Sequence, residues 1–199
     1  MPRCGTPHVD GTARPAGQLG GAPSRRGALG WILAAVAGPA AAAQAPLDAQ
    51  RSEAVAIGQA LRDGALVGLN GPTHRLFDFR GRPLIINVWA SWCGPCRQEM
   101  SSLERLAWRG DARRFNIIGI STDDDPAAAQ RLLATTNATI DHFIDRHLFW
   151  ETMLGASRLP LTVLLDANSR VLDRVYGAQQ WDGPEAARRI ARAFAHPPP

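Results

Sequence analysis

Residues 86–100 read INVWASWCGPCRQEM, and the rest of the fold can be worked out from this stretch. An apolar run of strand length, residues 84–89, leads into a turn that contains Cys93 and Cys96. Pro95 then opens a pattern of apolar residues at helical spacing, since proline is favoured in the first turn of a helix. The stretch therefore predicts a buried strand followed directly by a helix, with a CxxC pair at the junction.

The two cysteines stand where a thiol becomes reactive. Cys93 falls at the helix N-terminus, where unpaired N–H groups and the helix dipole favour a thiolate and lower the thiol pKa. Cys96 falls one turn further on the same face, within reach of a mixed disulfide formed by Cys93. Pro95 fixes the helix start, and Gly94 is expected to let the chain pass closely over the sulfurs. Trp92 provides an apolar rim that a partner polypeptide could cover. The spacing thus predicts thiol–disulfide exchange.

Other uses of a CxxC pair fit less well. Structural zinc needs four ligands, and no second CxxC or histidine cluster stands near the pair. Covalent haem attachment needs histidine directly after the second cysteine, where this chain has Arg97. His142 and His147 are interpreted as surface residues, and the acids at 123–125 as caps of a helix that begins at Pro126. We therefore expect no metal and no cofactor.

Strand and helix patterns alternate around this unit. A hairpin is predicted at residues 66–69 and 75–79, joined by Asn70-Gly71-Pro72. Further strands are predicted at 115–120, 143–144, 161–165 and 171–176, and helices from Pro95 to about Gly110, from Pro126 to about 136, and at 185–195. Trp150, Trp181 and Phe149 are interpreted as core or groove-edge aromatics. The order predicts an α/β fold with a mixed central sheet flanked by helices and an N-terminal hairpin extension.

The first 43 residues have the layout of an export signal. Arg25 and Arg26 precede an Ala-rich apolar stretch that ends in small residues, with cleavage expected after Ala43. The paired arginines resemble a twin-arginine signal, although Ala28 and Gly30 replace the phenylalanine and lysine usual there. The alternative is a retained membrane anchor, for which an apolar run of about 16 residues is short.

The chain after residue 43 is predicted to consist of a linker, one domain and a short tail. Residues 44–63 are predicted to be a linker or a short helix, residues 64–196 one domain, and residues 197–199 a tail. About 155 residues after the leader suffice for one domain with a sizeable core. Three cysteines are present, and with Cys4 in the leader only the CxxC pair remains, which points to a reactive rather than a structural pair.

The charge of the chain does not indicate nucleic-acid binding. Four arginines against one aspartate in residues 1–43 account for +3 of the formal net charge of +4. The mature protein would therefore be nearly neutral, and no surface for a polyanion is implied. We expect a monomer, since nothing in the sequence demands a dimer.

Residues 86–100 resemble the TlpA/ResA-like branch of the thioredoxin superfamily. The resemblance continues through residues 118–125 and 159–166 and covers about residues 64–194. It implies a thioredoxin-like fold and a periplasmic thiol-disulfide oxidoreductase. Pro160 matches the cis-proline that faces the CxxC in this fold, and with Leu159 it would line the groove where a partner docks.

The resemblance also implies roles for two polar residues near the cysteines, Asn87 and Glu99. Asn87 stands where thioredoxins proper have a buried aspartate, so another group must handle the proton of Cys96. Glu99 matches a glutamate that lies near the cysteines in ResA-like proteins, and a partly buried carboxylate there would have a raised pKa. We hypothesise that Glu99 assists the deprotonation of Cys96. The alternative is a solvated acid on the helix surface.

The resemblance favours a reductant over other functions. A membrane electron donor would keep the protein reduced, and its clients would be exported proteins with disulfides, such as apocytochrome c or copper-site cysteines in respiratory oxidase assembly. One alternative is a client-specific binding module in which redox turnover is incidental. Another is a disulfide-forming oxidant, which is disfavoured because Gly94-Pro95 resembles the dipeptide of reducing thioredoxins.

Overall fold

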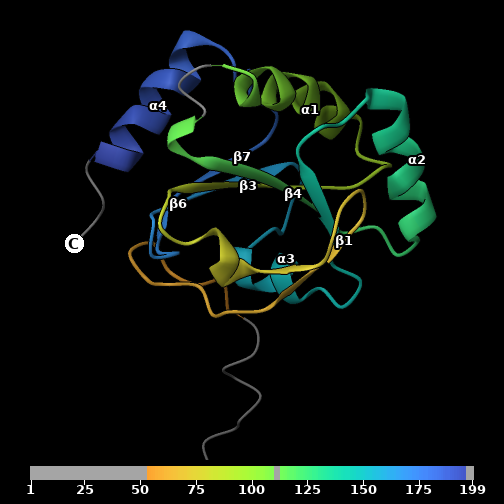
Figure 1. Ribbon diagram of the computed structural model, residues 1–199, viewed down its shortest axis with the longest axis horizontal. Helices are drawn as coiled ribbons and strands as arrows, with labels where there is room; N and C mark the ends of the chain where they lie inside the picture. The colour runs from red at the N-terminus through yellow and green to blue at the C-terminus, as the bar shows by residue number, and fades with distance from the viewer. Residues whose placement is uncertain (1–52, 110–112, 196–199) are drawn as a thin grey trace, which may run out of the picture. The chain divides into compact units, whose positions relative to one another are not determined.

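The computed structural model describes residues 53–109 and 113–195 (Figure 1). The predicted signal peptide at 1–43, the first part of the predicted linker at 44–52 and the tail at 197–199 lie outside the described residues. Among the helices of the described segments, none has the length and apolar character needed to span a bilayer.

A seven-stranded mixed sheet forms the centre of the fold, in the order β2-β1-β5-β4-β3-β6-β7. Its strands are β1 (Ala65–Gly68), β2 (His74–Arg75), β3 (Leu84–Trp89), β4 (Asn116–Ser121), β5 (Asp141–Ile144), β6 (Leu161–Leu165) and β7 (Val171–Tyr176). Strand β3 runs parallel to β4 and antiparallel to β6, and β4 runs parallel to β5. The mixed sheet and the antiparallel β6–β7 pair are therefore confirmed.

Helices cover both faces of this sheet. They are α1 (Gly94–Ala107), α2 (Pro126–Thr136), α3 (Phe149–Leu154) and α4 (Pro184–Ala195), with a 3-10 turn, η1, at Leu76–Phe79. Figure 1 shows α1 and α4 on one side of the sheet and α3 on the opposite side. This arrangement confirms the predicted α/β architecture with flanking helices.

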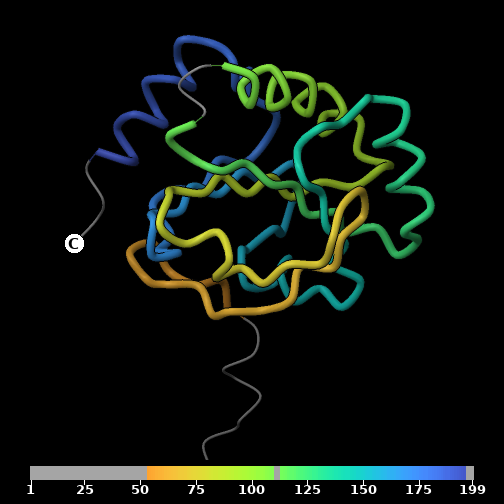
Figure 2. Tube along the Cα trace, in the orientation of Figure 1, coloured from red at the N-terminus to blue at the C-terminus, as the bar shows by residue number. Residues whose placement is uncertain are grey.

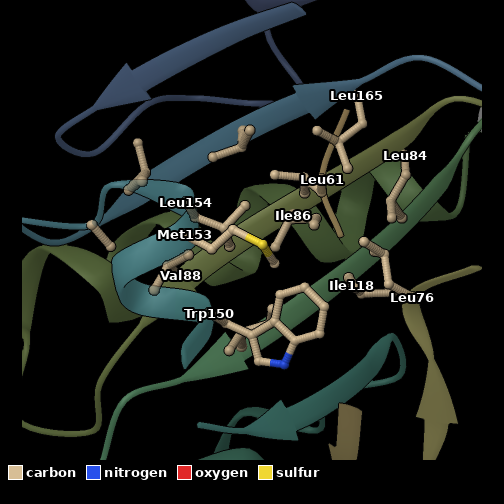
Figure 3. Close-up of a cluster of buried hydrophobic side chains, with 14 of the residues drawn as sticks. Leu61, Leu76, Leu84, Ile86, Val88, Ile118, Trp150, Met153, Leu154 and Leu165 are labelled. Atoms are coloured by element: carbon tan, nitrogen blue, oxygen red, sulfur yellow. The ribbon is translucent and has the colours of Figure 1, made fainter. Parts of the chain in front are cut away.

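Strand β3 separates two parts of the core because successive side chains of a strand point to opposite faces. Ile86 and Val88 pack with Trp150 of α3 in one buried cluster (Figure 3). Ile85 packs in another cluster, with residues of α1 and α4. Asn87 shares that second face, and all six residues of β3 are buried. The polar side chain of Asn87 therefore faces α1 and not solvent.

The N-terminal hairpin is present, but its second strand is shorter than predicted. Strand β1 pairs antiparallel with β2 and also joins the sheet through β5. Residues 76–79 were expected to be strand and instead form η1. The Asp78 carboxylate accepts a hydrogen bond from the Arg75 N–H at 2.7 Å, which ends the extended run one residue before η1.

The described part of the predicted linker, residues 53–63, contains no helix. It runs as an irregular segment on the same side of the sheet as α3 (Figure 2), and the Val55 N–H donates to the Met153 carbonyl at 3.0 Å. Leu61 is buried in the cluster that includes Trp150. The core therefore begins before residue 64.

Helix α3 was not predicted. It has only six residues, which is too short for a clear helical period. The buried Asp145 carboxylate starts it by accepting hydrogen bonds from the N–H groups of Phe149 at 3.0 Å and Glu151 at 2.7 Å. This cap stands several residues before the helix, so the usual pattern of a polar residue directly at the N-cap does not reveal it.

Candidate active site

The CxxC pair lies at the junction of β3 and α1, as predicted. Cys93 is the N-cap residue of α1, and Pro95 stands in the first turn. The two sulfurs form a disulfide with an S–S distance of 2.05 Å. The Cys96 N–H donates a hydrogen bond to Cys93 Sγ at 3.2 Å. Cys93 is 6 % exposed and Cys96 0 %, so Cys93 is the sulfur that a partner can reach.

The surroundings of Cys93 favour a thiolate after reduction. The first turn of α1 contains no acidic residue that would oppose a negative charge. The positive end of the helix dipole and the Cys96 N–H both point at the sulfur, and such groups lower the pKa of a cysteine. The local geometry therefore suits Cys93 to nucleophilic attack.

An apolar rim formed by Trp92 and Leu159 lies beside the pair. Trp92 is 72 % exposed beside it. Leu159 packs against the buried cluster that contains both cysteines. The peptide bond between Leu159 and Pro160 is cis, as the resemblance implies.

Gly94 is the first residue of α1. Beyond its chain neighbours and the backbone of its own helix, a Cβ at this position would meet nothing within 4 Å. No contact with another described segment therefore requires glycine here.

Glu99 is buried, being 1 % exposed, so its alternative interpretation as a solvated surface acid is wrong. Its Oε2 accepts a hydrogen bond from Asn87 Nδ2 at 3.0 Å. Its Oε1 accepts from the Gln179 N–H at 3.2 Å and from Trp181 Nε1. Burial raises the pKa of Glu99 to about 7, although the three hydrogen bonds act in the opposite direction. A carboxyl group that is partly ionised at neutral pH thus lies one helical turn after Cys96.

Asp123 supports the turn before the cysteines and does not cap α2, so its prediction as a cap is wrong. The cap is Asp125, which accepts from the Ala127 N–H at 2.9 Å. Asp123 is buried and accepts hydrogen bonds from the Ser91 N–H at 2.8 Å and the Ser91 hydroxyl at 2.7 Å. The Ser121 hydroxyl donates to it at 2.7 Å. Asp123 therefore connects the end of β4 to the residue that precedes Trp92 and Cys93.

His142 is buried, and its prediction as a surface residue is wrong. It is 1 % exposed, whereas His147 is exposed as predicted. His142 Nδ1 accepts a hydrogen bond from Trp89 Nε1 at 3.1 Å, and its Nε2 has no partner among the described residues. Burial lowers the pKa of His142 to about 3. The ring is therefore neutral at physiological pH and packs edge-on against Trp89, which belongs to the cluster that holds the cysteines.

In the described part of the chain, no group of three or more His, Cys, Asp or Glu side chains is placed to hold an ion. The two cysteines are bonded to each other. Glu99 is surrounded by hydrogen-bond donors, which repel a cation. The arrangement suits proton and electron transfer by the side chains themselves.

Comparison with known proteins places this geometry among thiol-disulfide oxidoreductases. A family model described as Redoxin matches residues 56–190. The chain is 30 % identical over 124 residues to the thiol-disulfide oxidoreductase ResA of Geobacillus thermodenitrificans, covering 62 % of this chain and 71 % of that protein. It is 33 % identical over 134 residues to the thiol:disulfide interchange protein DsbE of Vibrio cholerae, covering 65 % of this chain and 70 % of that protein.

Solved structures agree with these relatives. A crystal structure from Chlorobium tepidum, of a protein assigned as thiol:disulfide interchange protein DsbE, superposes with a TM-score of 0.63 at 26 % identity. The match covers 70 % of this chain and 99 % of that one. A secreted disulfide oxidoreductase of Mycobacterium tuberculosis, at 22 % identity and a TM-score of 0.54, shares the fold over 64 % of this chain and 94 % of its own.

Proposed function

Because the chain belongs to the Redoxin family and is a thiol-disulfide oxidoreductase of the ResA and DsbE type, we propose that it reduces disulfides in exported client proteins. The observation that supports this role is the placement of Cys93 at the N-terminus of α1, with Cys96 bonded to it and Trp92 exposed beside it. The proposed place of action is the periplasm, reached through the leader at residues 1–43. The protein works there as a monomer, without a cofactor.

The proposed reaction transfers two electrons from the dithiol to the client. The Cys93 thiolate attacks one sulfur of the client disulfide, forms a mixed disulfide and releases the first client thiolate. Cys96 then loses its proton, and its thiolate attacks Cys93 Sγ and releases the second client thiolate. The product is the Cys93–Cys96 disulfide, which is the form in the structure. A membrane electron donor would return the pair to the dithiol.

Glu99 is the proposed acceptor of the Cys96 proton. Its carboxyl group has a pKa of about 7, and a base near the operating pH is effective in proton transfer. Cys96 is fully buried, so it cannot give its proton directly to bulk water. Glu99 and Cys96 stand three residues apart on α1, which places both on one face of the helix.

The rim supports a protein client over a small molecule. Trp92 is one of the most exposed large apolar residues among the described segments, and its position next to Cys93 lets it pack against a bound polypeptide. The backbone at Leu159 and Pro160 is proposed to align the client chain beside the sulfurs. The clients we propose are apocytochrome c or copper-site cysteines of respiratory oxidase assembly, as the ResA-like resemblance implies.

Trapping with a Cys96→Ser variant tests the proposed reaction. Without the resolving thiol, the mixed disulfide through Cys93 cannot be released, so covalent adducts with clients are expected to accumulate and to dissociate on addition of dithiothreitol. The measurement is non-reducing electrophoresis of periplasmic extracts followed by mass spectrometry of the adducts. The matched control, Cys93→Ser, is expected to give none. Absence of adducts with Cys96→Ser would instead support a binding module with incidental redox activity.

A further inference from the structure

One stripe of α1 is bonded to the β7–α4 loop, residues 177–183. The stripe residues that make these contacts are Glu99, Ser102 and Arg105, and Arg109, just after the end of the helix, also donates to the loop. The Ser102 hydroxyl accepts a hydrogen bond from the Trp181 N–H at 3.0 Å. The Arg105 guanidinium pairs with Asp182 at 2.5 Å. The position of the loop is therefore fixed relative to the helix that begins at the CxxC pair.

Trp181 lies at the centre of this contact. It is 1 % exposed and packs among apolar residues of α1 and α4, including Leu103 and Ile190. Its indole N–H donates a hydrogen bond to Glu99 Oε1. An indole nitrogen can only donate, so at this position it requires an acceptor such as a carboxylate.

Among the described residues, every hydrogen-bond partner of the Glu99 carboxylate is a donor. Asn87 donates to Oε2, and the Gln179 N–H and the Trp181 indole N–H donate to Oε1. Donors favour the ionised form of a carboxyl group, whereas burial favours the neutral form. The two effects oppose each other at Glu99, so the loss of one donor shifts the balance towards the protonated acid.

Neighbouring charges contribute little to this balance. Strands β3 and β6 contain no charged residue. The titratable group that precedes Glu99 on the same face of α1 is Cys96. The charged side chains of Arg105 and Asp182 pair with each other, and the Arg109 guanidinium donates to the Asp182 carbonyl. Helix α4 contributes the apolar Ala186 and Ile190 to the cluster around Trp181. Burial and the hydrogen-bond donors therefore determine the protonation of Glu99.

We propose that Trp181 is a positioning residue of the thiol–disulfide reaction, whose indole N–H fixes the Glu99 carboxylate and sets the pH range in which it takes the proton of Cys96. This inference rests on the proposed role of Glu99. It assigns a function to a residue about 80 positions away in the sequence, on a loop that contains no cysteine. The loop thereby becomes part of the chemistry of the CxxC pair.

The test is a Trp181→Phe variant, which retains an aromatic ring in the core but lacks the N–H. The pKa of Glu99 is measured in the disulfide form by carboxyl ¹³C NMR, which is practicable with five glutamates in the chain and with Glu99→Gln to assign the signal. We expect the pKa of Glu99 to rise by about one to two units, the equivalent of one hydrogen bond to a charged group.

The same variant is assayed for the step that Glu99 serves. The reduced protein is mixed with 5,5′-dithiobis(2-nitrobenzoate), whose first thiolate leaves on attack by Cys93 and whose second leaves when Cys96 resolves the mixed disulfide. The rate of the second release is followed as a function of pH. The midpoint of this pH profile is expected to move upward by the same amount as the pKa of Glu99. The first release depends on Cys93 and is expected to keep its pH midpoint.

Trp150→Phe is the matched control. Trp150 is also fully buried, and its Nε1 donates to the Ala65 carbonyl at 2.9 Å on the other side of the sheet. The Trp150→Phe variant is expected to be less stable, but the pKa of Glu99 and the pH midpoint of the second release are expected to stay unchanged. If Trp181→Phe does not fold, Ser102→Ala removes the hydroxyl that holds the Trp181 backbone and is expected to give a smaller upward shift.

The outcomes separate the inference from the proposed function. An unchanged pKa of Glu99 in Trp181→Phe, or a shifted pKa with an unchanged second release, would overturn the inference. Failure of the unmodified protein to release either thiolate would overturn the proposed function itself. Parallel upward shifts of the pKa and of the second release support the inference.

Discussion

Replacing Gly119 with alanine is expected to lower the free energy of unfolding by about 3 kcal/mol or more, since the new methyl group overpacks a closed part of the core. Gly119 of β4 pairs with His142 of β5, and the His142 ring lies across it. A Cβ at Gly119 would stand 2.0 Å from His142 Nδ1 and 3.0 Å from Trp89 Nε1. Both side chains are buried, so neither can move aside without breaking its packing. Urea unfolding monitored by tryptophan fluorescence measures the effect.

Two further variants show whether the contact with His142 is the cause. Gly94→Ala, where the Cβ meets open space, is expected to change the free energy of unfolding by no more than about 1 kcal/mol. In a double-mutant cycle, Gly119→Ala is expected to cost much less in a His142→Ala background, because the ring is gone. Strictly additive costs would contradict a clash between the two residues.

Acid is expected to destabilise the protein through His142. Its folded pKa of about 3 lies below the ordinary value of 6.5, so the unfolded chain binds a proton that the folded chain excludes. The stability from the neutral ring is complete above pH 6.5 and is lost as the pH falls from there towards 3. At pH 5 the loss is about 2 kcal/mol, from 1.36 kcal/mol for each pH unit below 6.5.

A His142→Asn variant isolates this contribution. Its side-chain oxygen can accept the Trp89 hydrogen bond, and it does not titrate. The difference in unfolding free energy between the two proteins is expected to shift by about 2 kcal/mol in favour of the variant between pH 7.5 and pH 5. The raised pKa of Glu99 acts in the opposite direction, because protonation stabilises the buried acid, but it is present in both proteins and cancels. A difference that stays constant with pH would contradict a buried neutral histidine.

Local signals in the sequence were sufficient for most of the fold. Helix α2 begins at Pro126 after an acidic N-cap, and β6 and β7 have the bounds that their apolar runs predict. The junction of β3 with α1 follows from the apolar run and Pro95. These features depend on residues that are neighbours along the chain, so periodicity and capping rules apply to them.

The environment of each polar residue near the site could not be predicted in this way. Glu99 is buried because the β7–α4 loop, about 80 residues later, supplies Gln179 and Trp181 as donors. His142 is buried because Gly119 on the adjacent strand leaves room for its ring. Asp123 faces the turn at Ser91 instead of the helix that follows it. Each depends on a contact between distant segments, which a single sequence without its fold does not reveal.

The reduction potential of the Cys93–Cys96 couple tests the central claim most directly. It is measured on the purified protein without its leader, by equilibration against glutathione or dithiothreitol buffers and quantification of free thiols. A dedicated reductant is expected to have a value near that of thioredoxin, about −270 mV. A value near −120 mV, typical of a strong periplasmic oxidant, would contradict the proposed direction of electron transfer.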